Sequence, residues 1–134
     1  MARVRSKDTV PEKRVRTVAH SMGLRFRLHR KDLAGQPDLV FPQHKVAIFV
    51  HGCFWHQHPN CRRASVPQTR RAFWTNKLSG NVRRDGEATR ALRADGWRVA
   101  VIWECETKDG EEIERKLAEI FSKSGRRRKT KGTA

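Results

Sequence analysis

The chain contains two short, mostly apolar runs, KVAIFV at residues 45–50 and WRVAVIW at residues 97–103. Apolar residues that follow one another without polar alternation are typical of strands that are covered on both faces of a sheet. Such strands need a layer of helices on each side, so they limit the possible folds. We therefore expect both runs to be central strands.

The segments before the first apolar run predict a helix and two further strands. Residues 9–12 (TVPE) have the form of a helix capping box, with proline tolerated in the first turn. Apolar residues then recur at helical spacing as far as Gly23, which is a plausible helix end. LRFRLHR (24–30) alternates apolar and basic residues, as a half-exposed strand does, and DLVF (38–41) predicts a short strand.

The remaining segments predict helices on either side of the 97–103 strand. The pattern from residue 68 to residue 95 is mostly helical, with an interruption expected around Ser79-Gly80-Asn81. GEEIERKLAEIFSK (110–123) predicts an amphipathic helix that closes the domain. Its expected inward-facing residues are Ile113, Leu117, Ile120 and Phe121.

The order of these elements predicts an α/β sandwich with a mixed sheet. A chain of 134 residues is long enough to bury one core without disulfides. We expect one folded domain over residues 1–123, followed by a basic, disordered tail over residues 124–134. The tail would add phosphate attraction that is independent of sequence, or serve only as a solvated segment that aids solubility.

The charge balance points to a polyanionic partner. The chain has 30 Lys and Arg residues against 14 Asp and Glu residues, a formal net charge of +16. Six of the basic residues lie between residues 123 and 131, which leaves +10 for the rest of the chain. An excess of this size favours nucleic acid over a membrane as the partner.

Neither a membrane span nor a signal peptide is expected. No apolar run approaches the roughly 20 residues that a spanning helix needs, and MARVRSKDTV lacks the apolar stretch of a signal peptide. We expect a cytoplasmic, nucleoid-associated protein. Three cysteines in a reducing compartment do not make a closed set of disulfides, so metal binding is the first use to consider.

A dense group of cysteines, histidines and aromatic residues, HGCFWHQHPNC, follows the first apolar run at residues 51–61. Cys53, His58 and Cys61 have the spacing C-x4-H-x2-C, and Cys105 follows the second apolar run. Three sulfurs and one nitrogen suit a closed, structural zinc site. The alternative is that Cys53 and Cys105 are small buried apolar residues and Cys61 is a free thiol.

The motif in its context resembles the very-short-patch mismatch repair endonucleases. The resemblance rests on HGCFWH with a further His and Cys, the preceding PD, and the following FW, NV-x-RD, GWRV and WEC, from about residue 9 to residue 105. It implies a restriction-endonuclease-like three-layer α/β/α sandwich. It also implies Mg²⁺-dependent nicking of one DNA strand, 5′ to the thymine of a T·G mismatch left by deamination of 5-methylcytosine. The implied partners are mismatched double-stranded DNA and repair proteins, and a monomer suits a single-strand nick.

The resemblance also assigns roles to particular residues. Asp38 corresponds to the metal-binding aspartate, His51 and His56 to the active-site histidine pair, and Glu12 to a glutamate early in the first helix. The zinc ligands correspond to Cys53, His58, Cys61 and Cys105. The aromatic residues that enter the base stack correspond to Phe54, Trp55 and Trp74.

The chemistry of phosphodiester hydrolysis explains why such residues are needed. Mg²⁺ neutralises charge on the phosphate and is held by hard oxygen ligands. By the resemblance, the expected ligands are the Asp38 carboxylate and the backbone carbonyl of Val50. A histidine can take a proton from the attacking water at cellular pH, the role expected for His56, with His51 close by. Without the resemblance, Asp38 would be interpreted as a turn residue. For Glu12, a role as helix cap and a role in the active site are equally supported.

Rigid aromatic rings offer a physical route to mismatch preference. Apolar wedges unstack a base step at a cost of a few kcal/mol, and the cost is least where pairing is already defective. The alternative is that Phe54, Trp55 and Trp74 cover a small core beside the zinc. The chain also departs from the family: Val50 replaces the usual threonine, the Cys53–Cys61 loop is one residue longer, and the N-terminal segment is shorter.

Two other functions compete with mismatch nicking. One is a less selective DNA nuclease of a restriction or defence system, which would cut matched and mismatched duplexes alike. The other is a zinc-stabilised DNA-binding module without nuclease activity. An aspartate next to a histidine pair argues against the binding module, because a pure binder has no use for a metal anchor there.

Overall fold

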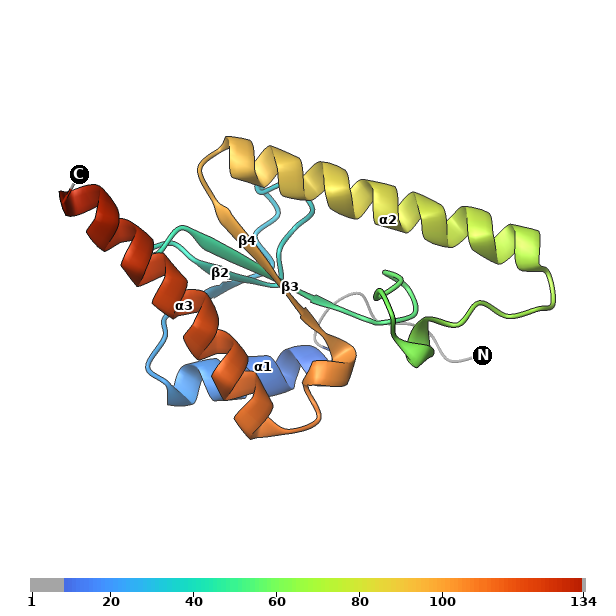
Figure 1. The fold of residues 1–134 in the computed structure, drawn as a ribbon, viewed down its shortest axis with the longest axis horizontal. Coiled ribbons are helices and arrows are strands. Elements are labelled where there is room, and N and C mark those ends of the chain that lie inside the picture. The colour runs from blue at the N-terminus through green and yellow to red at the C-terminus, as the bar shows by residue number, and fades with distance from the viewer. Residues whose placement is uncertain (1–8, 134) are drawn as a thin grey trace.

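The computed structural model describes the backbone of residues 9–133 and the side chains of residues 9–122 (Figure 1). The N-terminal segment noted above, residues 1–8, lies outside the described residues. The elements in chain order are α1 (Val10–Ser21), β1 (Arg27–Leu28), β2 (Leu39–Phe41), β3 (Val46–His51), the short 3-10 helix η1 (Arg62–Ala64), α2 (Arg71–Ala94), β4 (Arg98–Trp103), the 3-10 helix η2 (Glu104–Glu106) and α3 (Gly110–Thr133).

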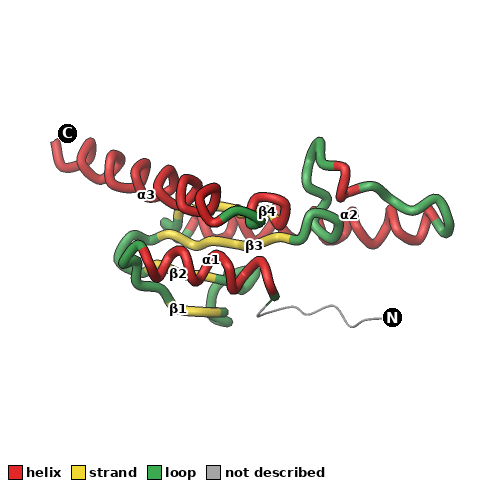
Figure 2. Tube along the Cα trace, turned by 90° about the horizontal axis from the view of Figure 1, so that it is seen from below, coloured by secondary structure: helices red, strands yellow, loops and turns green. Residues whose placement is uncertain are grey.

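The four strands form one mixed sheet in the order β1-β2-β3-β4. β1 pairs with β2 and β2 with β3 in antiparallel fashion, whereas β3 and β4 are parallel. Helices α1 and α3 cover one face of the sheet and α2 covers the other, which is a three-layer α/β/α sandwich (Figures 1 and 2). The predicted fold class is therefore confirmed.

Two apolar cores hold the layers together. On one face, residues of α1 and α3 pack on alternate residues of β2 and β3, with Ile113, Leu117 and Ile120 buried and Phe121 partly buried as predicted. On the other face, Leu92 at the end of α2 and Trp97 pack with Val40 of β2 and with Ala47 and Phe49 of β3. β3 supplies both cores, so its side chains are almost all buried, as its unbroken apolar run predicts.

The parallel pairing of β3 and β4 positions the loops that follow them. The register runs from Val46↔Arg98 to His51↔Trp103, so both strands end at the same edge of the sheet. The loop after β3, which carries Cys53, therefore begins beside η2, which carries Cys105. Figures 1 and 2 show this loop and the first half of α2 extending beyond that end of β3.

The structure corrects three local predictions. β4 is an edge strand of the described sheet rather than a central one, and it is still covered on both faces because α2 and α3 pack on it. β1 is only two residues long, because Leu24 and Phe26 pack against the core without joining the sheet ladder. α2 continues without interruption through Gly80, whose cost of about 1 kcal/mol in a helix is too small to break it.

The helix α3 is longer than predicted. Its backbone is helical to Thr133, across the segment for which we expected a disordered tail. The side chains beyond Ser122 and the last residue lie outside the described part of the chain. The domain boundary at residue 123 stays a prediction.

A glycine in the turn before β2 is expected to be essential for stability. Gly35 has φ +72°, and a Cβ atom there would lie 2.6 Å from the Cβ atom of Ala88 and 3.1 Å from the Phe49 ring. We expect Gly35→Ala to lower the free energy of unfolding by about 1–3 kcal/mol, measured by urea denaturation. Gly110→Ala is the matched control, because a Cβ atom there meets nothing within 4 Å. Equal stability of the two variants would contradict this packing argument.

No helix in the described part of the chain is long and apolar enough to cross a membrane.

Candidate active site and metal cluster

A cleft of about 1030 Å³ opens at the end of β3. Its walls come from the start of α1, the segment from His29 to Asp38, the end of β3 with the loop that follows, and the middle of α2. The four residues predicted to be catalytic all line it, together with the backbone segment at Val50. These are Glu12, Asp38, His51 and His56.

Asp38 is held just before the start of β2, beside the end of β3. Its Oδ2 accepts a hydrogen bond from the Val50 N–H at 2.7 Å, and its own N–H donates to the carbonyl of Ile48. A strand residue directs its N–H and C=O to the same edge, so the Val50 carbonyl faces the Asp38 side. Burial raises the pKa of Asp38 to about 7, and the nearby Glu12 carboxylate adds to the rise.

Glu12 caps α1 and also lines the cleft. It completes the capping box of α1, because the Thr9 backbone N–H donates to Oε1 and the Thr9 hydroxyl accepts from the Glu12 N–H. Its other oxygen, Oε2, lies 2.7 Å from Nε2 of His29. The side chain is buried yet reaches the cleft, where ligand atoms of Glu12, His29 and Asp38 all lie within 4.8 Å of one another.

The two histidines after β3 stack on each other. The rings of His51 and His56 lie 3.8 Å apart with an interplanar angle of 6°. Nδ1 of His56 lies 2.7 Å from Oδ2 of Asp85 on α2. Burial, followed by the neighbouring His56, lowers the pKa of His51 to about 4, so His51 is neutral at cellular pH.

The four predicted zinc ligands come together at the edge where β3 and β4 end. Ligand atoms of Cys53, His58, Cys61 and Cys105 all lie within 4.8 Å of one another. Nδ1 of His58 lies 3.7 Å from Sγ of Cys53 and 3.5 Å from Sγ of Cys105. Bonds of about 2.3 Å to sulfur and about 2.0–2.1 Å to nitrogen place tetrahedral ligand atoms roughly 3.5–3.8 Å apart, so the donor set fits zinc.

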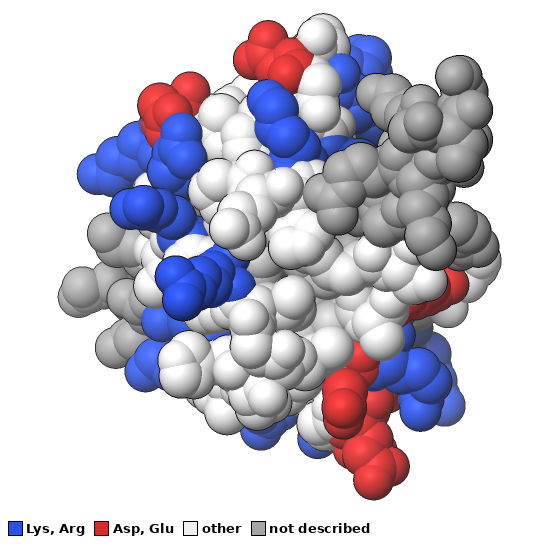
Figure 3. All heavy atoms as spheres, turned by 90° about the vertical axis from the view of Figure 1, so that its left-hand side faces the viewer, with Lys and Arg blue, Asp and Glu red and all other residues white. Residues whose placement is uncertain are grey.

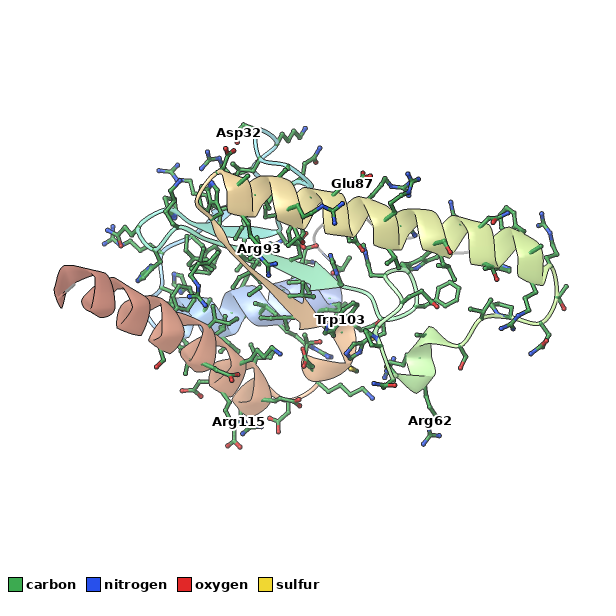
Figure 4. The ribbon with its side chains drawn as sticks, turned by 45° about the horizontal axis from the view of Figure 1, so that its top comes forward. Asp32, Arg62, Glu87, Arg93, Trp103 and Arg115 are labelled. Carbon is green, nitrogen blue, oxygen red and sulfur yellow. The ribbon has the colours of Figure 1, made fainter. Side chains whose placement is uncertain are left out.

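The surroundings support this cluster on two sides. The His58 ring stacks on Trp103 at 4.2 Å, and Figure 4 shows Trp103 at the end of β4 next to the loop after β3. Glu104 accepts a hydrogen bond from the Cys53 N–H. Burial raises the pKa of Cys53 to about 12, so metal binding would have to displace a proton from this thiol.

The three aromatic residues predicted to enter the DNA stack form one cluster. Trp55 and Trp74 lie 5.9 Å apart, and Phe54 contacts both rings. All three are half-buried, and the more exposed Phe73 extends the cluster on α2. The Asn81 side chain donates to the carbonyl of Trp55 and so ties the loop after β3 to α2.

The structure adds cleft residues that the sequence reasoning missed. The most notable are His29, opposite Asp38, and a row of polar residues on α2. The row consists of Lys77, Asn81, Arg84 and Asp85. Their spacing of four, three and one places them on one face of a helix, and this helical periodicity of polar residues was the signal that could have revealed them.

The three-layer fold and the cleft of carboxylates and histidines define a DNA endonuclease of the restriction-endonuclease-like class. Among solved structures, the chain is similar to the homing endonuclease I-Bth0305I catalytic domain, with a TM-score of 0.61 and 20% sequence identity. The match covers 87% of this chain and 98% of that one, and it supports the fold alone.

Sequence comparison identifies the family within this class. The chain is 52% identical over 124 residues to the Type II nicking enzyme V.XorIIP of Xanthomonas oryzae pv. oryzae, covering 92% of this chain and 90% of that protein. It is 40% identical over 113 residues to the DNA mismatch endonuclease Vsr of Escherichia coli K12, covering 84% and 72%. The sequence model of the family described as "DNA mismatch endonuclease Vsr" matches residues 1–63. The chain belongs to the Vsr family of DNA mismatch endonucleases.

Proposed function

We propose that this endonuclease nicks one strand of double-stranded DNA in a Mg²⁺-dependent reaction, 5′ to the thymine of a T·G mismatch, and that it acts as a monomer. The observation that carries the proposal is the meeting of Asp38, the Val50 backbone and the His56–Asp85 pair in one open cleft. A carboxylate anchor and a histidine base within one cleft are what metal-assisted hydrolysis of a phosphodiester requires.

The cleft would hold Mg²⁺ through oxygen ligands. The Asp38 carboxylate and the Val50 carbonyl are the hard donors that this ion prefers, and bound Mg²⁺ would stabilise charge on the scissile phosphate. The pKa of Asp38, about 7 without metal, means that cation binding must first remove or outcompete its proton. Lys77 and Arg84 line the same cleft, and their positive charge would attract the DNA backbone.

His56 would act as the general base. Its Nδ1 faces the Asp85 carboxylate at 2.7 Å, an arrangement that favours the proton on Nδ1 and leaves Nε2 free to accept one from water. The stacked His51 is neutral, because its pKa is about 4, so it would orient groups by hydrogen bonding rather than by positive charge.

We expect Asp85→Asn to slow nicking by about 10²-fold with little change in DNA affinity. The amide would no longer hold His56 in the tautomer that accepts a proton at Nε2, and general base catalysis is worth about 10²–10⁴-fold. Single-turnover nicking rates and DNA binding would be measured together. The exposed Glu87→Gln on the same helix is the control (Figure 4). An unchanged rate for Asp85→Asn would contradict the role of this pair.

The aromatic cluster supports the mismatch preference. The loop that carries Phe54 and Trp55 lies between the histidine pair and the zinc ligands, so a bound zinc would restrain it, and Asn81 fixes its far side. Rings restrained in this way would enter a base stack at little entropic cost, most readily where a mismatch weakens the pairing.

The test is a gel assay on end-labelled T·G and T·A duplexes of otherwise equal sequence. The proposal predicts one nick, 5′ to the mismatched thymine, only with Mg²⁺ and only in the T·G duplex. Equal cutting of both duplexes would favour the less selective nuclease. Salt-sensitive binding without any scission would favour the zinc-stabilised binding module.

A further inference from the structure

We propose that Trp103 is a positioning residue for the nicking reaction, because its indole ring lies between the proposed zinc ligand His58 and the cleft residue His51. The inference rests on the proposed function, since Trp103 would act on His56, the proposed general base. It assigns a role to a side chain that reaches the general base through the ring of His51.

Four rings form a continuous row from the cysteine cluster to the cleft. The His58 ring stacks on Trp103 with a centroid distance of 4.2 Å and an interplanar angle of 11°. Trp103 and His51 meet edge to face at 5.3 Å and 68°, and His51 stacks on His56 at 3.8 Å and 6°. Stacked and edge-to-face pairs are arrangements that aromatic rings prefer, so each ring restrains the orientation of the next.

The fold fixes the position of Trp103 in this row. Trp103 is the last residue of β4 and pairs in register with His51, the last residue of β3. Its backbone N–H donates to Oε1 of Glu106 at 2.8 Å. The other carboxylate oxygen of Glu106 lies 3.2 Å from Nζ of Lys116 on α3. The parallel strand pair and α3 therefore both hold the backbone that carries the indole.

His51 takes its orientation from the rings around it. The residue is only 7% exposed, and its ring also lies 5.4 Å from that of Phe49. A shorter side chain at position 103 would open space beside His51, and neighbouring side chains relax partly into such a space. A shift of the His51 ring would disturb the His56 ring that stacks on it.

A small displacement of His56 is expected to have a large effect on the rate. A misplacement of about 1 Å in a reacting group can cost about 10²-fold. The same indole supports the His58 ring, and contacts of this kind orient histidines that bind a metal. Trp103 therefore serves the metal cluster and the histidine pair at once.

Nicking kinetics of the zinc-loaded protein test this role. We expect Trp103→Leu to slow single-turnover nicking of the T·G duplex by about 10²-fold at saturating protein, with DNA affinity nearly unchanged. Trp103→Phe keeps a flat ring and should nick within a few-fold of the wild type. Trp97→Leu is the matched control, because Trp97 stands just before β4 and packs in the core under α2. Wild-type nicking by Trp103→Leu, or an equal loss in Trp97→Leu, would overturn the proposal.

Thermal melting checks that each variant is folded. If Trp103→Leu does not fold, Trp103→Met takes its place with the same expectation, because a flexible thioether fills the space without a flat ring.

Nitrogen magnetic resonance of the histidine rings gives a readout that a general loss of stability would not change. The nitrogen shifts of His56 report its tautomer, which the 2.7 Å contact between Nδ1 and the Asp85 carboxylate favours in the wild type. We expect these shifts to change in Trp103→Leu and to stay at their wild-type values in Trp97→Leu. Unchanged His56 shifts in Trp103→Leu would overturn the proposal.

The two readouts separate this proposal from the proposed function. A protein whose His56 shifts respond to Trp103→Leu, but which nicks no T·G duplex, would contradict the proposed function and leave the positioning of His56 by Trp103 standing. T·G nicking that is equally fast in the wild type and in Trp103→Leu would support the proposed function and overturn the role of Trp103.

Discussion

Replacing Asp38 by asparagine is expected to reduce Mg²⁺-dependent nicking by about 10³-fold or more. The amide keeps the size of the side chain and still accepts from the Val50 N–H, but it loses the charge that anchors the cation. Metal stabilisation of the scissile phosphate is worth several kcal/mol, and each 1.36 kcal/mol corresponds to a factor of ten in rate. Single-turnover nicking of a labelled T·G duplex measures the loss.

The same variant should be more stable than the wild type at alkaline pH in Mg²⁺-free buffer. The pKa of Asp38 is about 7 in the folded protein, against an ordinary value of 3.8. Stability is therefore unaffected below about pH 4, falls as the unfolded chain loses the proton, and is fully reduced above pH 7. Asp38→Asn removes this loss, so we expect a gain of a few kcal/mol at most at pH 8 and none at pH 4.

The control for both measurements is Asp32→Asn. Asp32 is exposed in the loop before β2 and pairs with Arg30 (Figure 4). It should change neither nicking nor the pH dependence of unfolding. An Asp38→Asn protein that nicks at the wild-type rate, or that is less stable than wild type at pH 8, would contradict the buried-anchor interpretation.

Removal of zinc is expected to have the largest effect on stability. Cys53 lies in the loop after β3 and Cys105 lies in η2 after β4, so a shared ion would join the ends of the two strands. We expect a zinc-selective chelator, or Cys105→Ser, to lower the melting temperature by about 10 °C or more, because structural zinc contributes folding energy directly. Added Zn²⁺ should restore the chelated wild type, whereas Mg²⁺ should not.

His44→Gln serves as the control for the zinc experiment. His44 lies in the β2–β3 turn and contacts Phe121. This turn precedes β3, whereas Cys53 follows the opposite end of that strand. Its melting temperature should fall by the same amount as that of the wild type when zinc is chelated. A wild-type protein that binds no stoichiometric zinc and melts unchanged with chelator would show that the three cysteines act only as small buried residues and a free thiol.

The basic surface fits a DNA partner but does not locate it. Figure 3 shows Lys and Arg side chains spread over one end of the molecule, with fewer Asp and Glu side chains near its rim. At the opposite end, Figure 4 shows Arg62 of η1 pointing away from the body of the protein. Charges on more than one side agree with an excess of +16 that is not confined to the C-terminal segment.

The sequence predicted the layers of the fold well because its apolar pattern is local and strong. The unbroken run at residues 45–50 and the periodic residues of α3 each report burial directly. It predicted less well where packing decides. Gly80 suggested a helix break, but Asn81 ties the continuous α2 to the Trp55 carbonyl, and β4 became an edge strand despite its apolar run.

The candidate site was predictable only in part. The motif after β3 marked the histidine pair and the metal ligands, since those residues are adjacent in sequence. His29 and Asp85 were missed because each pairs with a residue 17 or 29 positions away in the sequence, and a contact of that range is made by the fold. The polar face of α2 was the available signal for Asp85. No comparable pattern marked His29.

The most direct test of the account is a crystal structure of the protein with a T·G duplex and Ca²⁺, a hard cation used here to hold the uncleaved complex. We expect Ca²⁺ about 2.3–2.6 Å from Asp38 and from the phosphate 5′ to the mismatched thymine, with His56 beside that phosphate. A complex in which the DNA backbone lies away from this cleft, or in which the cation binds without Asp38, would contradict it.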